Sequence, residues 1–201
     1  MIDIRNCDNM DLMRDFHDNY FDLAIVDPPY GIGAGNGVGV TRGQENKYTM
    51  KDWDNSIPNL NYWNQLFRVS KNQIIWGGNY MTDYLPPSRG WIYWQKLMGG
   101  NYADGELAWT SFDRNLKEFT KKTDQGGRFH PTQKPVQLYK WILDKYAKPN
   151  DKILDTHLGS GSIAIACHDY GFDLTACELD KDYFDAAMKR LRQHQAQTKL
   201  F

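Results

Sequence analysis

Residues 152–180 read KILDTHLGSGSIAIACHDYGFDLTACELD, and this stretch decides the fold. Two short apolar runs, Lys152–Asp155 and Leu174–Cys177, flank a glycine-containing turn and a helical pattern over Ser162–Tyr170. A strand, a turn, a helix and a second strand at this spacing predict a βαβ unit of a parallel sheet. Two glycines allow the backbone to turn tightly, and Ser162 can cap the helix that follows them.

The same alternation extends over the rest of the chain. Apolar runs predict further strands, and apolar residues at three- and four-residue spacing predict helices. A doubly wound, Rossmann-like, mostly parallel α/β sheet follows, with an antiparallel hairpin at one edge where GWIYWQK and ELAWTSF succeed each other. The remaining strands are predicted at Met1–Arg5, Phe21–Val26, Gln73–Trp76, Trp91–Gln95 and Leu107–Phe112, and the helices at Asn9–His17, Asn59–Val69, Gln137–Tyr146 and Lys181–Gln195.

Length and composition describe an ordinary globular chain. The 201 residues predict a single domain, 1–201, with 41% hydrophobic residues and a net charge of −1. The N-terminus has no secretory layout and no apolar run has the length of a membrane span, so a cytoplasmic protein is expected. Three cysteines without CxxC spacing are expected to stay reduced, and no metal site is expected.

Two segments carry few regular patterns. Residues 31–56 alternate glycine with small residues and then become polar, which indicates a mobile lid or binding loop. Residues 113–127 are irregular and basic, and a segment of this kind suits contact with a polyanion.

Three turns at strand ends hold the polar residues from which chemistry is expected, because an open parallel sheet binds ligands beyond the carboxyl ends of its strands. These turns are DPPY at 27–30, DTHLGSGS at 155–162 and CELD at 177–180. Glu178 lies about 20 residues after the glycine turn, where an acid accepts ribose hydroxyls. The sequence contains neither GxGxxG nor GxxxxGK[ST], so a nucleoside cofactor without phosphate, such as S-adenosylmethionine, is favoured.

The motifs DPPY, HPTQKP at 130–135, DTHLGSGS and CELD together resemble the amino-methyltransferases of DNA. The order, with DPPY before the glycine turn, is similar to the circularly permuted β class. The resemblance implies an adenine-N6 methyltransferase that uses S-adenosylmethionine, and it implies that the N-terminal strand joins the cofactor half of the sheet. Restriction-modification systems are the usual setting of such enzymes.

The resemblance also implies a set of cofactor-binding residues. Asp8 would accept from the adenine amine, although its position equally suits a helix cap. Thr132 and Lys134 would bind the methionine carboxylate. The complete expected set is Asp8, His130, Thr132, Gln133, Lys134, Asp155, His157, Gly159, Ser160, Gly161 and Glu178.

One departure from the family pattern concerns the residues before the glycines. The usual Asp-Pro-Phe is replaced by Asp155-Thr156-His157, which puts a titratable ring where the family packs an apolar one. A protonated His157 would oppose the positive sulfonium of the cofactor. Cofactor affinity is therefore the property that this departure is expected to affect.

DPPY suits methylation of an amine on a nucleobase. The lone pair of such an amine is delocalised into the ring, and two acceptors, the Asp27 carboxylate and the Pro28 carbonyl held by Pro29, would localise it. Tyr30 would stack on the base. Within a duplex the base has to be flipped out, and the basic residues expected to support it are Arg42, Lys47, Lys51, Arg114, Lys117, Lys121, Lys122 and Arg128.

Alternatives remain open at this stage. The acceptor could instead be cytosine N4, or an amine of RNA or protein, and a catalytically silent nucleic-acid-binding module is a third hypothesis. Asp rather than Ser at position 27 favours adenine. The resemblance implies a target-recognition segment at residues 113–129, and its shortness suggests a short or relaxed recognition site or help from a second subunit. The tail 196–201 resembles peptides that bind sliding clamps through Gln197, Leu200 and Phe201.

Overall fold

The computed structural model describes residues 1–34, 51–98, 103–122 and 128–197. These residues form one eight-stranded sheet, which confirms the doubly wound α/β class. From one edge to the other, the strands are β1 (Ile2–Arg5), β8 (Asp173–Cys177), β7 (Lys152–Asp155), β2 (Phe21–Val26), β3 (Ser70–Trp76), β5 (Gly105–Thr110), β4 (Trp91–Gln95) and β6 (Lys117–Thr120).

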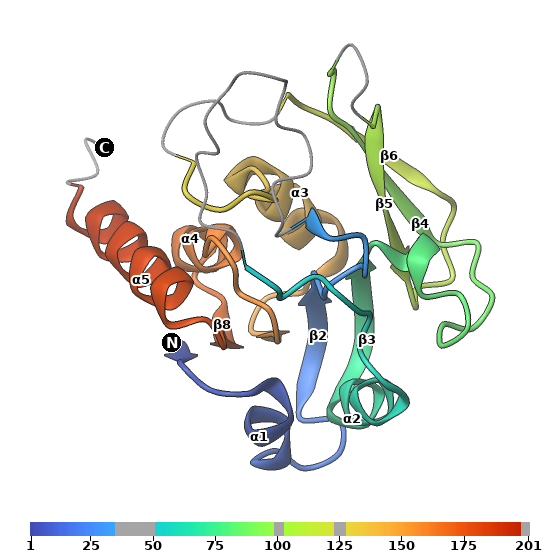
Figure 1. Ribbon diagram of the computed structural model, residues 1–201, viewed down its shortest axis with the longest axis horizontal. Coiled ribbons are helices and arrows are strands. Elements are labelled where there is room, and N and C mark those ends of the chain that lie inside the picture. Colours follow the sequence, from blue (N-terminus) through green and yellow to red (C-terminus); the bar gives the residue numbers. More distant parts are fainter. Residues whose placement is uncertain (35–50, 99–102, 123–127, 198–201) are drawn as a thin grey trace.

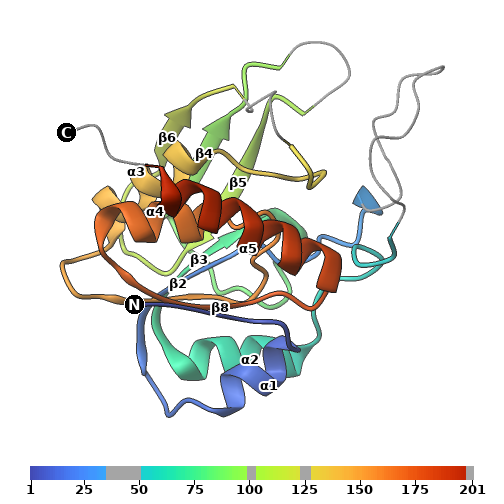
Figure 2. The ribbon, with the colours of Figure 1, turned by 90° about the vertical axis from the view of Figure 1, so that its left-hand side faces the viewer.

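Helices cover both faces of this sheet, so the molecule has three layers (Figures 1 and 2). One apolar core lies between the sheet and α1 (Asn9–Arg14) and α2 (Leu60–Val69). The other lies between the sheet and α3 (Val136–Tyr146), α4 (Ser162–Tyr170) and α5 (Lys181–Ala196). Because β2 is buried by both layers, its sequence is apolar at every position but Asp22 rather than alternating, whereas β3 is apolar only over its last three residues, 74–76.

The N-terminal strand closes the cofactor half of the sheet as the permuted order requires. β1 pairs in parallel with β8, with Arg5 opposite Cys177, and β8 pairs in parallel with β7. The strands β1, β8, β7, β2 and β3 therefore run in the same direction. Their carboxyl ends lie at one end of the strands, and the turns that leave them are on that same side of the sheet.

The predicted antiparallel hairpin is confirmed, but it is not the outermost pair. β4 and β5 pair antiparallel, and β6 adds in parallel to β4 inside the segment expected to be irregular. Only Phe119 of β6 is packed inward, against Trp141, whereas the other three residues are exposed. A four-residue edge strand with one apolar residue gives no alternation to detect.

Element ends differ from prediction where local hydrogen bonds intervene. α1 stops at Arg14 rather than His17, because the N–H groups of Asp15 and Phe16 bond three residues back and tighten the last turn. α4 is capped by Gly161 in the left-handed region, φ +71°, so Ser162 is its first residue and not its cap.

Several further expectations can be placed on the described residues. Cys7, Cys167 and Cys177 are free thiols. Across the ranges described above, no helix is both long and apolar enough to cross a bilayer. Gln197 is the C-cap of α5, whereas four of the singled-out residues lie outside the described residues: Arg42, Lys47, Leu200 and Phe201.

Candidate active site

A cavity of about 600 Å³ lies at the carboxyl ends of the parallel strands. It brings together the three turns singled out from the sequence and the HPTQKP segment. Nine of the eleven expected cofactor residues line it, whereas Asp155 and Gly161 do not. The lining includes Asp8, Asp27, Pro29, Trp53, His130, Thr132, Gln133, Lys134, His157, Gly159, Ser160, Glu178 and Tyr183.

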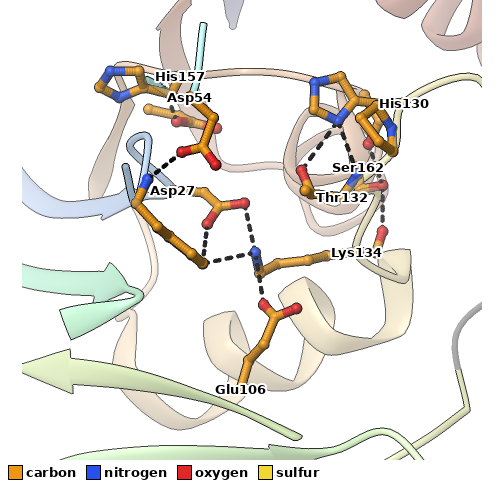
Figure 3. Close-up of polar contacts among 12 residues, drawn as sticks. Asp27, Asp54, Glu106, His130, Thr132, Lys134, His157 and Ser162 are labelled. Atoms are coloured by element: carbon orange, nitrogen blue, oxygen red, sulfur yellow. Dashed lines mark hydrogen bonds and ion pairs between the residues drawn. The ribbon is translucent and has the colours of Figure 1, made fainter. Parts of the chain in front are cut away.

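Asp27 directly follows β2 and lines this cavity, and both of its carboxylate oxygens already accept hydrogen bonds. The Tyr30 hydroxyl donates to Oδ1 at 2.6 Å, and the Lys134 ammonium donates to Oδ2 at 2.5 Å (Figure 3). A carboxylate has about four lone-pair positions. Two positions therefore remain for the hydrogens of a substrate amine, and the carboxylate cannot rotate freely.

Burial and the neighbouring carboxylates raise the pKa of Tyr30 well above its ordinary value. The largest causes are, in order, desolvation and the negative charges of Asp27 and Glu106. Tyr30 is therefore a protonated hydrogen-bond donor to Asp27 at neutral pH.

Asp54 fixes the chain where it leaves DPPY. Its buried carboxylate accepts from the backbone N–H groups of Tyr30 at 2.6 Å, Gly31 at 3.0 Å and Ala34 at 2.7 Å. The sequence gives no signal for this role, because an Asp in a polar stretch usually remains in solvent. Three donors on one carboxylate hold the turn in a single conformation.

The Tyr30 ring lies against the backbone of Gly77 and stacks on Tyr80. The ring centroids of the two tyrosines are 5.1 Å apart, with 16° between the ring planes. Part of the surface that the sequence assigned to a substrate base is therefore covered by Tyr80, whose side chain is 46% exposed.

Gly77→Ala is expected to displace Tyr30. The added Cβ would lie 2.2 Å from Cε1 of Tyr30, and Gly77 has φ +68°. We expect at least a tenfold loss of catalytic rate, because the hydroxyl of a displaced Tyr30 no longer holds Asp27. Gly171→Ala is the matched control, since Gly171 has φ +75° with nothing within 4 Å. Equal rates for the two variants in single-turnover assays would contradict this account.

The glycine turn and the CELD turn are joined by Glu178. Its Oε2 accepts from the N–H of Gly159 at 2.8 Å, and its Oε1 accepts from the N–H of Asp180 at 2.9 Å. Desolvation raises the pKa of Glu178, although these backbone donors oppose the shift. Glu178 also lines the cavity.

Asp8 and Ser162 have structural roles that the sequence left open or assigned differently. Asp8 caps α1, accepting from the N–H of Met10 at 2.7 Å, and also lines the cavity. Ser162 donates to the backbone carbonyl of Lys134 at 2.7 Å and accepts from Arg190 at 2.9 Å. Arg190 also donates to the carbonyl of Ser160, so α5 holds the glycine turn from behind.

His157 is a neutral ring, which removes the expected conflict with a cationic cofactor. Burial lowers its pKa to about 3. The Asn9 amide donates to Nε2 at 3.1 Å, so the proton resides on Nδ1 and is donated to Thr156 Oγ1 at 2.9 Å. Thr156 is in turn 2.8 Å from the Tyr62 hydroxyl. The polar pair Thr156-His157 is thus satisfied by neighbours that the sequence motif does not contain.

His157→Phe is expected to make folding less sensitive to acid. A histidine whose pKa is about 3 when folded and 6.5 when unfolded contributes stability that is complete above pH 6.5 and is lost as pH falls towards 3. Chemical denaturation between pH 6.5 and 4.5 should show a slope smaller by about 1.4 kcal/mol per pH unit in the variant. The exposed His17→Phe is the control, and an unchanged slope in His157→Phe would contradict the buried neutral state.

His130 and Asp155 also have shifted ionisation. Burial, with the nearby positive charge of Lys134 as the second cause, lowers the pKa of His130 to about 3. The centroid of its ring lies 4.3 Å from that of Tyr183 and 5.5 Å from that of Trp53. Burial raises the pKa of Asp155 to about 8. Asp155 accepts from the N–H of His157 at 3.0 Å, so it orders the turn from beneath the cavity.

Three of the basic residues expected to contact nucleic acid have other roles or positions. Lys51 forms ion pairs with Asp180 at 2.6 Å and Asp182 at 2.8 Å, and its side chain is 16% exposed. Arg114 donates to the carbonyl of Lys145 near the end of α3, which lies at the amino ends of the parallel strands, away from the cavity. Lys117 lies at that same end of the strands, because β6 starts there.

The remaining described basic residues lie nearer the cavity. β6 runs parallel to β4, so the chain leaves it towards the cavity edge at Lys121 and Lys122. Arg128 donates to the carbonyl of Pro131 at 2.5 Å and so supports the turn that carries His130. These three residues keep their predicted role as candidates for phosphate contact.

The comparisons with known proteins agree with this geometry. A type II methyltransferase of Lactococcus lactis subsp. cremoris, M2.LlaDCHI, is 24% identical over 238 residues, covering 94% of this chain and 88% of the relative. The type II methyltransferase M.HinfI of Haemophilus influenzae is 40% identical over 73 residues, covering 36% of this chain and 20% of the relative.

Two solved structures share the fold. The M1.HpyAVI–SAM complex aligns with a TM-score of 0.66 and 23% identity, over 95% of this chain and 100% of that one. The cytosine-N4-specific PvuII DNA methyltransferase aligns with a TM-score of 0.64 and 12% identity, over 94% and 86%. The fold is therefore that of the class I methyltransferases. The chain belongs to the DNA methylase family, whose model matches residues 75–189, and the resemblance to DNA amino-methyltransferases is confirmed.

Proposed function

We propose that this DNA amino-methyltransferase acts on the N6 amine of adenine and uses S-adenosylmethionine as methyl donor. The observation that carries the proposal is Asp27, which is fixed at the cavity rim with unused lone pairs and is followed at once by two prolines. An acceptor held in this way is suited to an exocyclic amine, whose hydrogens must be engaged before its lone pair becomes nucleophilic.

The cavity fits a nucleoside cofactor without phosphate. Its glycine turn is closed over by Glu178 rather than left open for an anion, and its rim offers the acceptors Asp8 and Glu178. Glu178 would bind the ribose, Asp8 the adenine amine, and Gly159 with Thr132 the methionine end. S-adenosylmethionine supplies an electrophilic methyl group. The neutral His130 and His157 leave the cavity without a histidine cation that would repel it.

The residues of the chain position the substrate amine. Asp27 and the Pro28 carbonyl accept from the two amine hydrogens, which draws the nitrogen towards tetrahedral geometry and frees its lone pair. Tyr30 orients Asp27, and Asp54 orients Tyr30. The transfer needs no covalent enzyme intermediate, and alignment of the two reactants accounts for much of the rate.

DNA binding follows from the position of the cavity. A base stacked in a duplex cannot reach Asp27, so the target is flipped out of the helix or presented in a single strand. Lys121, Lys122 and Arg128 contact phosphates at the cavity edge, and residues 31–56 and 113–129 supply the binding loop and the target-recognition segment. These contacts position the DNA, whereas the sequence recognised is set by residues that reach the base edges.

Cytosine N4 is the alternative acceptor, since its amine poses the same chemical problem. Asp at position 27 supports adenine. The deciding experiment incubates the protein with labelled S-adenosylmethionine and unmethylated DNA and identifies the modified nucleoside after digestion. N6-methyladenine is the expected product. N4-methylcytosine, or the absence of label in DNA, would refute the proposal, and label appearing in RNA or protein instead would identify the other acceptor class.

A further inference from the structure

Four charged side chains form a continuous line that starts at Asp27 and leads away from the cavity. Lys134 bridges Asp27, at 2.5 Å, and Glu106, at 3.0 Å (Figure 3). Glu106 also pairs with Lys96. They come from four segments: the end of β2, the HPTQKP segment, β5 and the residue after β4. Signs alternate along the line, so its net charge is zero.

Lys134 is committed to this line rather than to the cofactor. Its side chain is 2% exposed, and an ammonium has three donors. It donates to Asp27 and, at 3.4 Å, to the Tyr30 hydroxyl, and it forms an ion pair with Glu106 at 3.0 Å. The sequence assigned Lys134 to the methionine carboxylate, but the structure directs its ammonium at protein groups on the substrate side of the cavity.

The ion pairs keep both partners charged despite their burial. Desolvation lowers the pKa of Lys134, but Asp27 and Glu106 raise it by more, so the net shift is upward. Desolvation raises the pKa of Glu106, but Lys134 and Lys96 lower it by more, so the net shift is downward. An isolated charge at either position would be costly, and each is stabilised by the next.

The backbone of Lys134 is fixed as well. Its carbonyl accepts from Ser162, the first residue of α4, and Ser162 is held by Arg190. The segment that carries Lys134 is therefore tied to the glycine turn, so the side chains of Ser162 and Lys134 together connect that turn to Asp27.

We propose that Lys134 is a positioning residue for methyl transfer, which acts through Asp27 and is itself held by Glu106. With Tyr30 on Oδ1 and Lys134 on Oδ2, the remaining lone pairs of Asp27 point where the amine must bind. Glu106 balances the charge of Lys134, so that a positively charged methyl donor meets no excess positive charge. This inference rests on the proposed role of Asp27 as the amine acceptor.

The test is chemical rescue of Lys134→Ala. We expect kcat to fall about 100-fold, as when one preorganised group is removed from an active site. The Kd for S-adenosylhomocysteine, measured by calorimetry, should change less than twofold, because Lys134 does not bind the cofactor. Propylammonium should raise the kcat of Lys134→Ala at least tenfold, because it fills the vacated space with a cation. The neutral propanol should leave the kcat of the variant unchanged.

Lys140→Ala is the matched control. Lys140 also pairs with a carboxylate, that of Asp169 at 2.6 Å, but it lies on α3 away from the cavity. We expect the wild-type kcat in this variant and no effect of propylammonium. Rescue of both variants, or of neither, would overturn the positioning role, and so would a large loss of S-adenosylhomocysteine affinity in Lys134→Ala.

If Lys134→Ala does not fold, Glu106→Gln tests the same row of charged side chains. It keeps the shape of the side chain and removes its charge, and we expect a tenfold lower kcat with unchanged S-adenosylhomocysteine affinity. A wild-type kcat in Glu106→Gln would overturn the inference. The proposed function is judged separately by the wild-type protein: failure of wild type to label DNA refutes that function, whereas labelling by wild type and Lys134→Ala alike refutes only the positioning role.

Discussion

Asp27→Ala is expected to lower the single-turnover rate of methyl transfer by about 10³-fold or more. The substitution removes the one side-chain acceptor aimed at the substrate amine, and loss of a single preorganised group of this kind costs 10²–10³-fold. It also leaves Lys134 and Tyr30 without their shared partner. Rapid-quench measurement with labelled S-adenosylmethionine at saturating DNA checks the rate.

Cofactor binding separates this loss from unfolding. Asp27 accepts from Tyr30 and Lys134 and not from the glycine turn, so the affinity for S-adenosylhomocysteine should survive. Asp22→Ala is the control, because Asp22 also lies on β2 and pairs with Lys71, but at the opposite edge of the sheet. Full activity in Asp27→Ala, or an equal loss in Asp22→Ala, would refute the role assigned to Asp27.

Asp54→Ala should lower stability and rate together. Three backbone N–H groups lose their acceptor, and hydrogen bonds to a charged group contribute about 1.5–3 kcal/mol each. Water can accept from some of these N–H groups in the variant, so we expect a loss of about 3 kcal/mol in the free energy of unfolding. The rate should fall at least tenfold, since Tyr30 no longer has a fixed backbone.

Two further substitutions make the Asp54 prediction specific. Asp54→Asn keeps one acceptor oxygen and should lose about half as much stability as Asp54→Ala. Asp52→Ala removes an exposed carboxylate two residues earlier and should match the wild type in both measurements. Wild-type stability and rate in Asp54→Ala would show that the turn is held by other contacts.

The sequence was sufficient for the elements whose patterns are local. β2, β4, β7 and α4 have the predicted bounds, because continuous apolar runs and helical spacing record burial directly. β6 was missed, because an exposed edge strand of four residues has no pattern of its own and exists through its pairing with β4.

Some residues of the candidate site were also predictable from the sequence, whereas others were not. Motifs placed Asp27, Tyr30, Gly159 and Glu178 at strand ends, and the topology of a parallel sheet brings those ends together. Asp54 and Glu106 carried no motif, since their roles depend on which donors the fold places beside them. Lys51 and Arg114 were assigned to DNA from charge alone, but folding gave Lys51 carboxylate partners and placed Arg114 at the far edge.

The sequence by itself determined the class of fold and the family and singled out Asp27, because these follow from burial patterns and from motifs a few residues long. Only the tertiary structure decided how Asp27 is held, that His157 is neutral and that the ammonium of Lys134 pairs with Asp27 and Glu106. The physical reason is that ionisation and orientation depend on distance and desolvation between segments far apart in the chain. Asp27 and Lys134 are separated by more than a hundred residues in sequence and by one hydrogen bond in space.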